Sequence, residues 1–289
     1  NTVKNLNYQL KQLCQRNHDG SYATRHNRER TLTLIADQLH LLGYRRMSAQ
    51  SLKPKHIDAL VARWQAEALA IGTIKNRMSA LRWWAEKVNK PSVIAHSNDH
   101  YGIPDRQLVT GVSKARQLGS EALDQVRDPH VRMSLELQRA FGLRREEAIK
   151  FQPHYADRGD HLVLKASWTK GGKARMIPIL STTQRELLTR THQLAGRGSL
   201  IPLDRDYRQQ LRVYERHTAN AGLTRMHGLR HAYAQERYAT LTGRQAPAAG
   251  GPSVATLSPA ERQQDQQVRL QISRELGHER IEVLSVYLS

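Results

Sequence analysis

The sequence predicts a mainly α-helical protein with one small antiparallel β-sheet, an α+β fold. Apolar residues recur three or four positions apart along most of the chain, which is the spacing of one helix face. The clearest β signal runs from Leu162 to Ile179, where HLVLKASW and KARMIPI flank Gly171-Gly172. A Gly-Gly pair between two such segments is typical of a two-residue hairpin turn. The 289 residues allow two domains with a core in each.

The first hundred residues are predicted to form a small helical bundle. One apolar stripe ends at Gly43, which can terminate its helix, and a second follows Pro54 near a helix start. A third helix is expected to open at Thr73 or Asn76. The three stripes consist of Leu32, Ile35, Leu39 and Leu42; of Ile57, Leu60, Val61 and Trp64; and of Ile74, Leu81, Ala85 and Val88. The other positions of the third helix carry basic residues, Lys75, Arg77, Arg82 and Lys87.

Turn-forming residues divide the rest of the chain. The clusters HSND and YGIPD, within residues 91–111, indicate a linker. Helices are expected over residues 120–151 with a break at Asp128-Pro129, over 182–194, 206–221 and 228–241, and from the capping sequence at Ser258 toward Glu275. Residues 242–257, TGRQAPAAGGPSVATL, are rich in Gly, Pro and Ala and are predicted to form a flexible loop.

The charge balance favours a polyanionic partner. Lys and Arg number 45 against 26 Asp and Glu, a formal net charge of +19. Residues 1–100 hold 16 basic and 7 acidic residues, a net +9, and the remaining +10 lies in residues 101–289. Both halves are therefore expected to touch the polyanion; the alternative is a well-solvated surface with incidental charge.

Cysteine content and hydropathy argue against a disulfide-rich, a membrane-spanning or a secreted protein. The single Cys14 excludes an internal disulfide framework and a cysteine-based zinc site, and it fits a reducing compartment. The chain has no run of 18 or more apolar residues, so no membrane span is expected, and no signal peptide is visible. The chain begins with Asn1 rather than Met, so we expect a region of a longer polypeptide.

Four short frames in the second half contain residues suited to phosphodiester chemistry. They are FGLRREEA, WTKGGKAR, HGLRHAYA and LGHERIEVLSVY. The residues singled out are Arg144, Lys170, His227, Arg230, His278 and Tyr287. Taken singly, each has an ordinary structural explanation, such as a packed tyrosine, a surface ion pair, a helix-capping histidine or an exposed turn charge. Together they supply a phenol nucleophile, proton-transfer groups and fixed positive charges, the equipment for breaking and rejoining a phosphodiester without a metal.

The order and spacing of these frames resemble the tyrosine recombinase (phage integrase) family, over roughly residues 112–288. The resemblance implies a helical, SAM-like core-binding domain at residues 1–95 and a linker at 96–111. A catalytic domain would follow at residues 112–289, and the segment at 242–257 would be an insertion within it.

The resemblance also implies roles for individual residues. Tyr287 would attack a DNA phosphorus and leave a 3′-phosphotyrosyl link. Because a phenol has a pKa near 10, it needs a base or local positive charge to react at neutral pH. Arg144 and Arg230 would hold the non-bridging oxygens through paired donors. His227, three residues before Arg230, would transfer the tyrosine's proton.

Further residues complete the implied site. Lys170 would protonate the departing 5′-oxygen, with Lys173 across the turn as the competing candidate. His278 would bond a non-bridging oxygen, and Glu147 would orient the basic groups, while His231 would have a supporting role. Contacts with DNA are expected from Lys75, Arg77, Arg82, Lys173 and Arg175.

The predicted protein is thus a site-specific DNA recombinase, an integrase of a bacterial mobile element, that uses no metal, ATP or other cofactor. Its expected partners are double-stranded attachment-site DNA, three further protomers in a tetramer on that DNA, and directionality or DNA-bending factors. We expect it in the cytoplasm, at the nucleoid. The alternatives are a type IB topoisomerase or telomere resolvase with the same tyrosine chemistry, a metal-dependent transposase, whose acidic residues lack a frame here, and a DNA-binding protein without catalysis.

Overall fold

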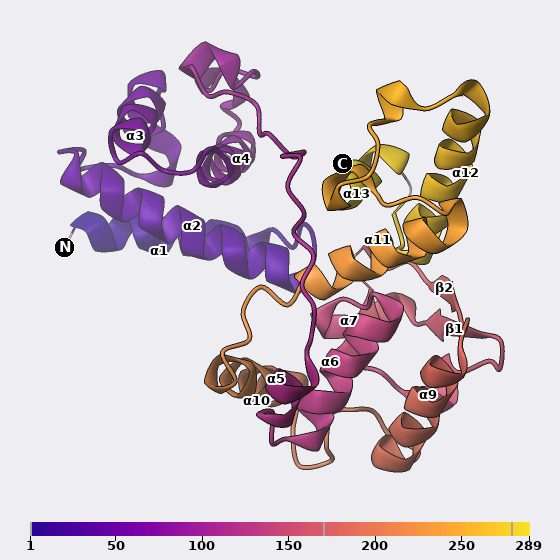
Figure 1. The fold of residues 1–289 in the computed structure, drawn as a ribbon. Coiled ribbons are helices and arrows are strands. Elements are labelled where there is room, and N and C mark those ends of the chain that lie inside the picture. The colour runs from indigo at the N-terminus through magenta and orange to yellow at the C-terminus, as the bar shows by residue number, and fades with distance from the viewer. Residues whose placement is uncertain (1, 170, 279) are drawn as a thin grey trace. The chain divides into compact units, whose positions relative to one another are not determined.

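The structure, a computed structural model, describes residues 2–169, 171–278 and 280–289. The chain divides into two compact units, residues 1–107 and residues 108–289 (Figure 1). Each unit buries apolar clusters of its own, as an independent domain requires.

Four α-helices pack around one core in the described part of the N-terminal unit. They are α1 (Thr2–Arg16), α2 (Tyr22–Leu41), α3 (Pro54–Ala66) and α4 (Ile71–Lys87), with 3₁₀ turns at Ala49–Ser51, Pro91–Val93 and Asp99–Tyr101. Helices α1 and α2 lie side by side (Figure 1). The three predicted apolar stripes face the core, and only Leu42 among them is partly exposed.

Two buried tryptophans join these helices. Trp64 of α3 donates a hydrogen bond from Nε1 to Oε1 of Gln38 on α2, at 2.8 Å. Trp84 of α4 donates from Nε1 to the backbone carbonyl of Ala49, also at 2.8 Å. Each indole therefore fills the core while its only polar group keeps a partner.

The start of α4 differs from the sequence prediction. The helix begins at Ile71, not at Thr73 or Asn76, and the carbonyl of Ala70 accepts from the amide of Thr73 at 2.8 Å. The chain reverses just before this point at Ala68, which has a φ of +49°. This reversal fixes the helix start without a side-chain cap, so a prediction based on capping residues places the start two or more residues after Ile71.

Part of the predicted linker at residues 96–111 is packed on the N-terminal unit, which extends to Gln107. Ile103 is buried in the core of this unit. Arg106 donates to the carbonyl of Gly72 at 2.7 Å and to Oδ1 of Asn76 at 2.8 Å. One apolar and one basic side chain thus hold a segment whose composition is that of a turn.

The second unit contains the remaining elements. Its helices are α5 (Ser120–Asp124), α6 (Pro129–Phe141), α7 (Arg145–Ile149), α8 (Pro153–Ala156), α9 (Thr182–Ala195), α10 (Tyr207–Asn220), α11 (Gly228–Thr242), α12 (Pro259–Glu275) and α13 (Ser285–Leu288). The predicted break at Asp128-Pro129 is present, because Oδ1 of Asp128 caps α6 by accepting from two backbone amides.

The sheet is antiparallel but shorter than predicted. Strands β1 (His161–Leu164) and β2 (Arg175–Pro178) pair with His161 opposite Pro178 and Leu164 opposite Arg175. The connection therefore spans residues 165–174, and the expected two-residue turn at Gly171-Gly172 is wrong. The reason is Trp168, which lies in a 3₁₀ turn and packs into the core instead of continuing the strand.

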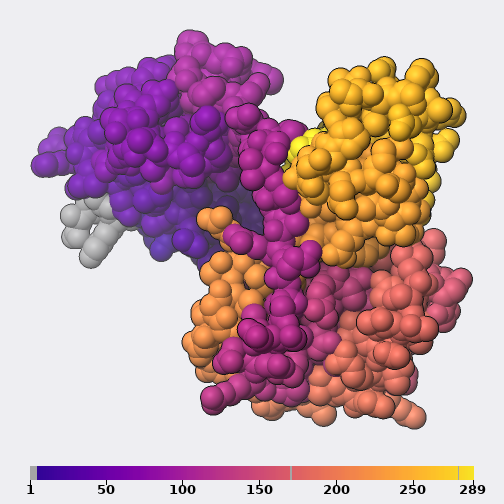
Figure 2. All heavy atoms as spheres, viewed as in Figure 1, coloured from indigo at the N-terminus to yellow at the C-terminus, as the bar shows by residue number. Residues whose placement is uncertain are grey.

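Helix α11 is enclosed along most of its length and packs against α6, α12 and α13 (Figure 1). In Figure 2 the segment from α11 to α13, orange to yellow, forms a lobe that adjoins β1, β2 and α9. Residues 242–257, predicted to be a flexible loop, contain two 3₁₀ turns, and Ala246 is fully buried. A Cβ at Gly251 would meet the carbonyl oxygen of Gln245 at 1.8 Å, so this segment folds tightly on itself.

None of the helices among the described residues has the length and apolar character needed to cross a membrane.

Two adjacent tryptophans provide a test of the N-terminal core. Trp84→Ala should lower the free energy of unfolding by about 3–5 kcal/mol, because it leaves a cavity and an unpaired carbonyl at Ala49. Trp83→Ala is the matched control, since that ring is only partly buried and packs against Arg28 at 4.3 Å. Chemical denaturation of the full chain measures both losses; equal losses would contradict this account.

Candidate active site

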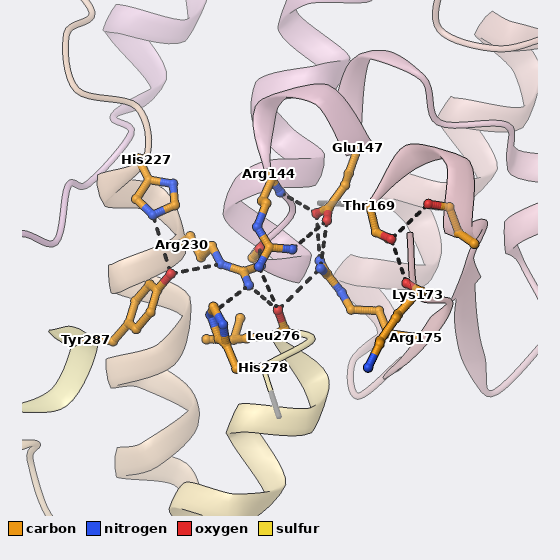
Figure 3. Close-up of polar contacts among 12 residues, drawn as sticks. Arg144, Glu147, Thr169, Lys173, Arg175, His227, Arg230, Leu276, His278 and Tyr287 are labelled. Atoms are coloured by element: carbon orange, nitrogen blue, oxygen red, sulfur yellow. Dashed lines mark hydrogen bonds and ion pairs between the residues drawn. The ribbon is translucent and has the colours of Figure 1, made fainter. Parts of the chain in front are cut away.

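The residues of the predicted site come from separate elements of the second unit and meet in one place (Figure 3). Arg144 precedes α7, and Glu147 lies in its first turn. The others are Arg175 at the start of β2, His227 and Arg230 at the start of α11, His278 after α12, and Tyr287 in α13. Strand alternation turns Arg175 inward, since Arg175 and Ile177 are buried while Met176 is exposed.

The buried carboxylate of Glu147 joins two of the arginines. It accepts from the backbone amide of Arg144 at 2.6 Å and from Nη1 of Arg144 at 2.8 Å. Arg175 makes a bidentate pair with it through Nη1 and Nη2, both at 2.7 Å. Burial alone would raise the pKa of Glu147, but the charges of Arg175, Arg230 and Arg144 outweigh it and hold the pKa below its ordinary value. Glu147 is therefore ionised at neutral pH.

The backbone carbonyl of Leu276, at the end of α12, is the second shared acceptor. It accepts from Nη2 of Arg144 at 3.4 Å, from Nη1 of Arg175 at 3.3 Å and from Nη2 of Arg230. The next residue must be glycine for two reasons. Gly277 has a φ of +66°, and a Cβ there would meet Cδ of Arg175 at 2.8 Å.

Arg230 is almost completely enclosed, with 1 % of its surface exposed. Its Nη1 donates to the carbonyl of Gly142 at 2.6 Å, its Nη2 lies 3.4 Å from Nε2 of His278, and its Nε donates to Oη of Tyr287 at 3.4 Å. Burial, together with the charges of Arg175 and Arg144, lowers the pKa of Arg230 to about 10. The guanidinium remains charged at neutral pH, and most of its donors are engaged within the protein.

Tyr287 is held against α11. Its Oη lies 3.4 Å from Nε2 of His227, and its ring centroid lies 4.4 Å from that of His231. Gln235 of α11 donates from Nε2 to the backbone carbonyl of Tyr287 at 2.9 Å. The tyrosine is 5 % exposed, so the phenol faces Arg230 and His227 rather than solvent.

Two histidines of the site are neutral. Burial, and then the nearby positive charges led by Arg230, lower the pKa of His278 to about 4. Burial, and then the neighbouring His227, lower the pKa of His231 to about 4, and the buried Nδ1 of His231 has no hydrogen-bond partner among the described residues. At neutral pH each ring therefore has one N–H donor and one acceptor nitrogen.

A second buried ion pair supports the end of α12. Glu275, next to Leu276, accepts from the hydroxyl of Tyr233 at 2.9 Å and from Nη2 of Arg237 at 3.1 Å. Both partners are on α11, so this network ties the two helices together just before the shared carbonyl. No frame in the sequence pointed to Glu275, Arg237 or Gln235, because their positions depend on how α11, α12 and α13 pack.

Five of the six residues predicted from the frames lie together: Arg144, His227, Arg230, His278 and Tyr287. Lys170 lies outside the described residues. Its competitor Lys173 is exposed, and its backbone carbonyl accepts from Oγ1 of Thr169 at 2.6 Å. Arg175 was expected on the DNA-contacting surface, but the structure places it in the buried centre on Glu147; the alternation of RMIP was the available signal.

The three cations expected to contact DNA from the N-terminal unit have intramolecular partners. Lys75 pairs with Asp105 at 2.5 Å, and the guanidinium of Arg77 lies 5.3 Å from the ring centre of Trp64. Arg82 donates to the carbonyl of Ala95 at 3.1 Å and to Oδ1 of Asn98 at 2.8 Å. A polar groove of about 650 Å³ runs between α2 and α4, and Arg82 lines it together with Asn27, Arg28, Asn76, Ser79 and Trp83.

Within the part of the chain that the structure describes, no group of three or more His, Cys, Asp or Glu side chains is arranged to hold a metal ion.

Sequence models of two domains match this chain. A phage integrase N-terminal domain matches residues 3–91, and an integrase domain matches residues 106–236, together 220 of the 289 residues. The chain belongs to the phage integrase family of tyrosine recombinases. No curated protein matches it significantly by sequence.

Solved structures of phage integrase family members and related recombinases share the fold. A lambda integrase dimer bound to a COC′ core site has a TM-score of 0.63 at 16 % identity, covering 98 % of this chain and 76 % of the other. XerH recombinase bound to palindromic difH has a TM-score of 0.59 at 16 % identity, with coverages of 98 % and 81 %. The Tn1549 transposon integrase with circular intermediate DNA has a TM-score of 0.58 at 14 % identity, with coverages of 99 % and 95 %.

The burial of His231 in this phage integrase family member predicts an acid-sensitive stability. The pKa of His231 falls from 6.5 to about 4 on folding, so between these pH values the unfolded chain binds a proton at this ring and the folded protein does not. Stability is therefore full above pH 6.5 and declines as the pH falls toward 4, by up to about 1.4 kcal/mol per pH unit for this ring. Denaturation of wild type and His231→Phe at several pH values should give a shallower decline in the variant; identical slopes would refute this assignment.

Proposed function

We propose that the protein is a site-specific DNA recombinase that cleaves and rejoins DNA through a 3′-phosphotyrosyl intermediate, without metal or ATP. One observation carries the proposal: Oη of Tyr287 lies 3.4 Å from both Nε of Arg230 and Nε2 of His227. A candidate nucleophile, a fixed positive charge and a proton acceptor thus share one point. Family membership and the likeness in fold to DNA-bound recombinases support the same conclusion.

The first step would be an in-line displacement at phosphorus. The phenolic oxygen of Tyr287 forms a new bond to phosphorus as the bond to the 5′-oxygen breaks, and the phenolic proton passes to His227. The departing 5′-oxygen needs a proton, for which Lys170 is the candidate. One phosphodiester is exchanged for another, so the reverse attack by a 5′-hydroxyl needs no added energy source. The 3′ polarity of the link follows the family resemblance.

The arginines would stabilise the charge on the non-bridging oxygens. Phosphoryl transfer depends mainly on positioning and charge neutralisation. Arg144, whose side chain is 17 % exposed, and Arg230 both donate to the Leu276 carbonyl, so their guanidinium groups lie close together. A phosphate entering the site would replace the contacts that Arg230 now makes with Tyr287 and His278, which frees the phenol to attack. A neutral His278 can then donate its N–H to an oxygen of the phosphate.

The proposed partner is double-stranded DNA carrying an attachment site. The net charge of +19 favours it, and phosphate contacts should make affinity fall with added salt. The fold of this chain also resembles that of a lambda integrase tetramer bound to a Holliday junction, with a TM-score of 0.63. We propose that four protomers of this chain likewise pair two sites. On the N-terminal unit, the polar groove between α2 and α4, which Arg28 and Arg82 line, is a better DNA-contact surface than Lys75, paired with Asp105, or Arg77, packed on Trp64.

Covalent trapping tests the nucleophile. A nicked duplex containing a site selected from a random-sequence library by wild-type protein should yield an SDS-resistant adduct with wild type. Tyr287→Phe removes only the hydroxyl, so it should bind this duplex with unchanged affinity and give no adduct. The reaction is run in EDTA, where undiminished wild-type yield separates the proposal from a metal-dependent transposase. An adduct at full yield with Tyr287→Phe would assign the role to another residue.

The role of Arg230 separates chemistry from binding. Arg230→Ala should slow adduct formation on the same duplex by roughly 10²–10³-fold or more, since it removes a fixed charge from the transition state. Affinity by gel shift should change far less. Because Arg230 is buried, Arg230→Lys serves as a second variant that keeps the charge but loses the paired donors. Equal losses in rate and affinity would place Arg230 in DNA binding alone.

Relaxation of supercoiled plasmid that lacks the selected site distinguishes the remaining enzymatic alternative. A recombinase needs its site, so slow relaxation is expected, whereas fast site-independent relaxation would indicate a type IB topoisomerase.

A further inference from the structure

A hollow of about 350 Å³ adjoins the candidate active site and has no role in the chemistry proposed above. His227 lines it, and the same ring lies 3.4 Å from Oη of Tyr287 through Nε2. Two further basic residues line the hollow, Arg145 and Arg225, together with Gln138 and Glu215. The hollow is therefore polar, carries more positive than negative side chains, and begins where the reactive centre ends.

Arg225 stands out by its backbone and its surroundings. It is exposed, and its φ of +55° is a left-handed conformation that costs a non-glycine residue about 1–2 kcal/mol. Glu215, the carboxylate that lines the same hollow, pairs with Arg145 instead. The carbonyl of Arg225 accepts from the amide of Gly228 at 2.8 Å, so the strained turn leads directly into α11. The turn therefore fixes the backbone position of Arg225 relative to this helix. Strain of this kind is retained where a local function requires it.

Arg145 makes a weak ion pair that a stronger partner could replace. It pairs with Glu215 of α10 at 3.0 Å, with side-chain exposures of 47 % and 53 %. A surface pair of this kind is worth about 1 kcal/mol or less. A phosphate that accepts hydrogen bonds through two of its oxygens is a stronger partner for a guanidinium than an exposed carboxylate. Arg145 follows Arg144 in the chain, so its backbone is fixed by the same turn that positions the candidate site.

We propose that this hollow binds the phosphate adjacent to the scissile phosphate on the cleaved strand, with Arg225 as its main contact and Arg145 as the second. The inference rests on the proposed function: with one phosphate at Tyr287, a strand that runs past His227 would bring its next phosphate to this hollow. Holding two successive phosphates fixes the direction of the strand as well as its position. The arrangement thereby aligns the 5′-oxygen opposite the tyrosine.

Neutral phosphate analogues test this site. A methylphosphonate, which lacks the negative charge, is placed in turn at each of the two phosphates flanking the scissile one in the selected nicked duplex. With wild-type protein, one of the two substitutions should slow adduct formation by about tenfold or more. Arg225→Ala should be slowed by a similar factor on unmodified DNA and lose nothing further on that methylphosphonate duplex.

Two variants serve as controls in the same assay. Arg216→Ala removes the same charge from an exposed position of α10 that does not line the hollow, and it should keep the full sensitivity to the methylphosphonate. Glu215→Gln removes the competing carboxylate and should increase the rate loss caused by the methylphosphonate. Gel-shift affinities of all proteins for the same duplexes are measured in parallel.

The outcomes separate this inference from the proposed function. No adduct from wild type on unmodified DNA would refute the proposed function. An adduct that forms, but with equal methylphosphonate sensitivity in wild type and Arg225→Ala in both rate and affinity, would overturn the adjacent-phosphate site alone. Loss of sensitivity in Arg225→Ala but not in Arg216→Ala would support it.

Discussion

Three guanidinium groups share the centre of this site, and they do so because two acceptors lie between them. Glu147 supplies a buried negative charge to Arg144 and Arg175, and the carbonyl of Leu276 accepts from all three arginines. Without these acceptors the buried cations would repel one another at a cost of several kcal/mol. The surplus of positive charge that remains after this compensation is what the site can offer a phosphate.

Helix α11 connects this charge cluster to Tyr287, the proposed nucleophile. It carries Arg230 and His227, and it holds Tyr287 through Gln235 and the ring of His231. Tyr287 and Arg230, one of the proposed phosphate-binding donors, are therefore both held by this helix. Arg230 donates to the phenolic oxygen, so in the proposed reaction the binding of a phosphate and the release of Tyr287 would involve the same guanidinium.

The sequence revealed what is encoded locally. The helical periods gave the bundle of the N-terminal unit, and three of the four frames located Arg144, His227, Arg230, His278 and Tyr287, because each of these frames is a local sequence with its own signature; the residue predicted from the fourth, Lys170, lies outside the described residues. The errors concern long-range packing: Trp168 ended the first strand early, Arg175 turned inward on Glu147, and Ile103 anchored part of the linker. The acceptor role of Leu276 could not be predicted, since a backbone carbonyl has no sequence signature.

The glycine that follows Leu276 limits how this centre can diverge. A Cβ at Gly277 would crowd the Arg175 side chain that pairs with Glu147, in addition to straining the backbone. A substitution at Gly277 would therefore need an accompanying change at Arg175. We expect these two sites, remote in the chain, to drift as a pair while the surfaces around them vary freely.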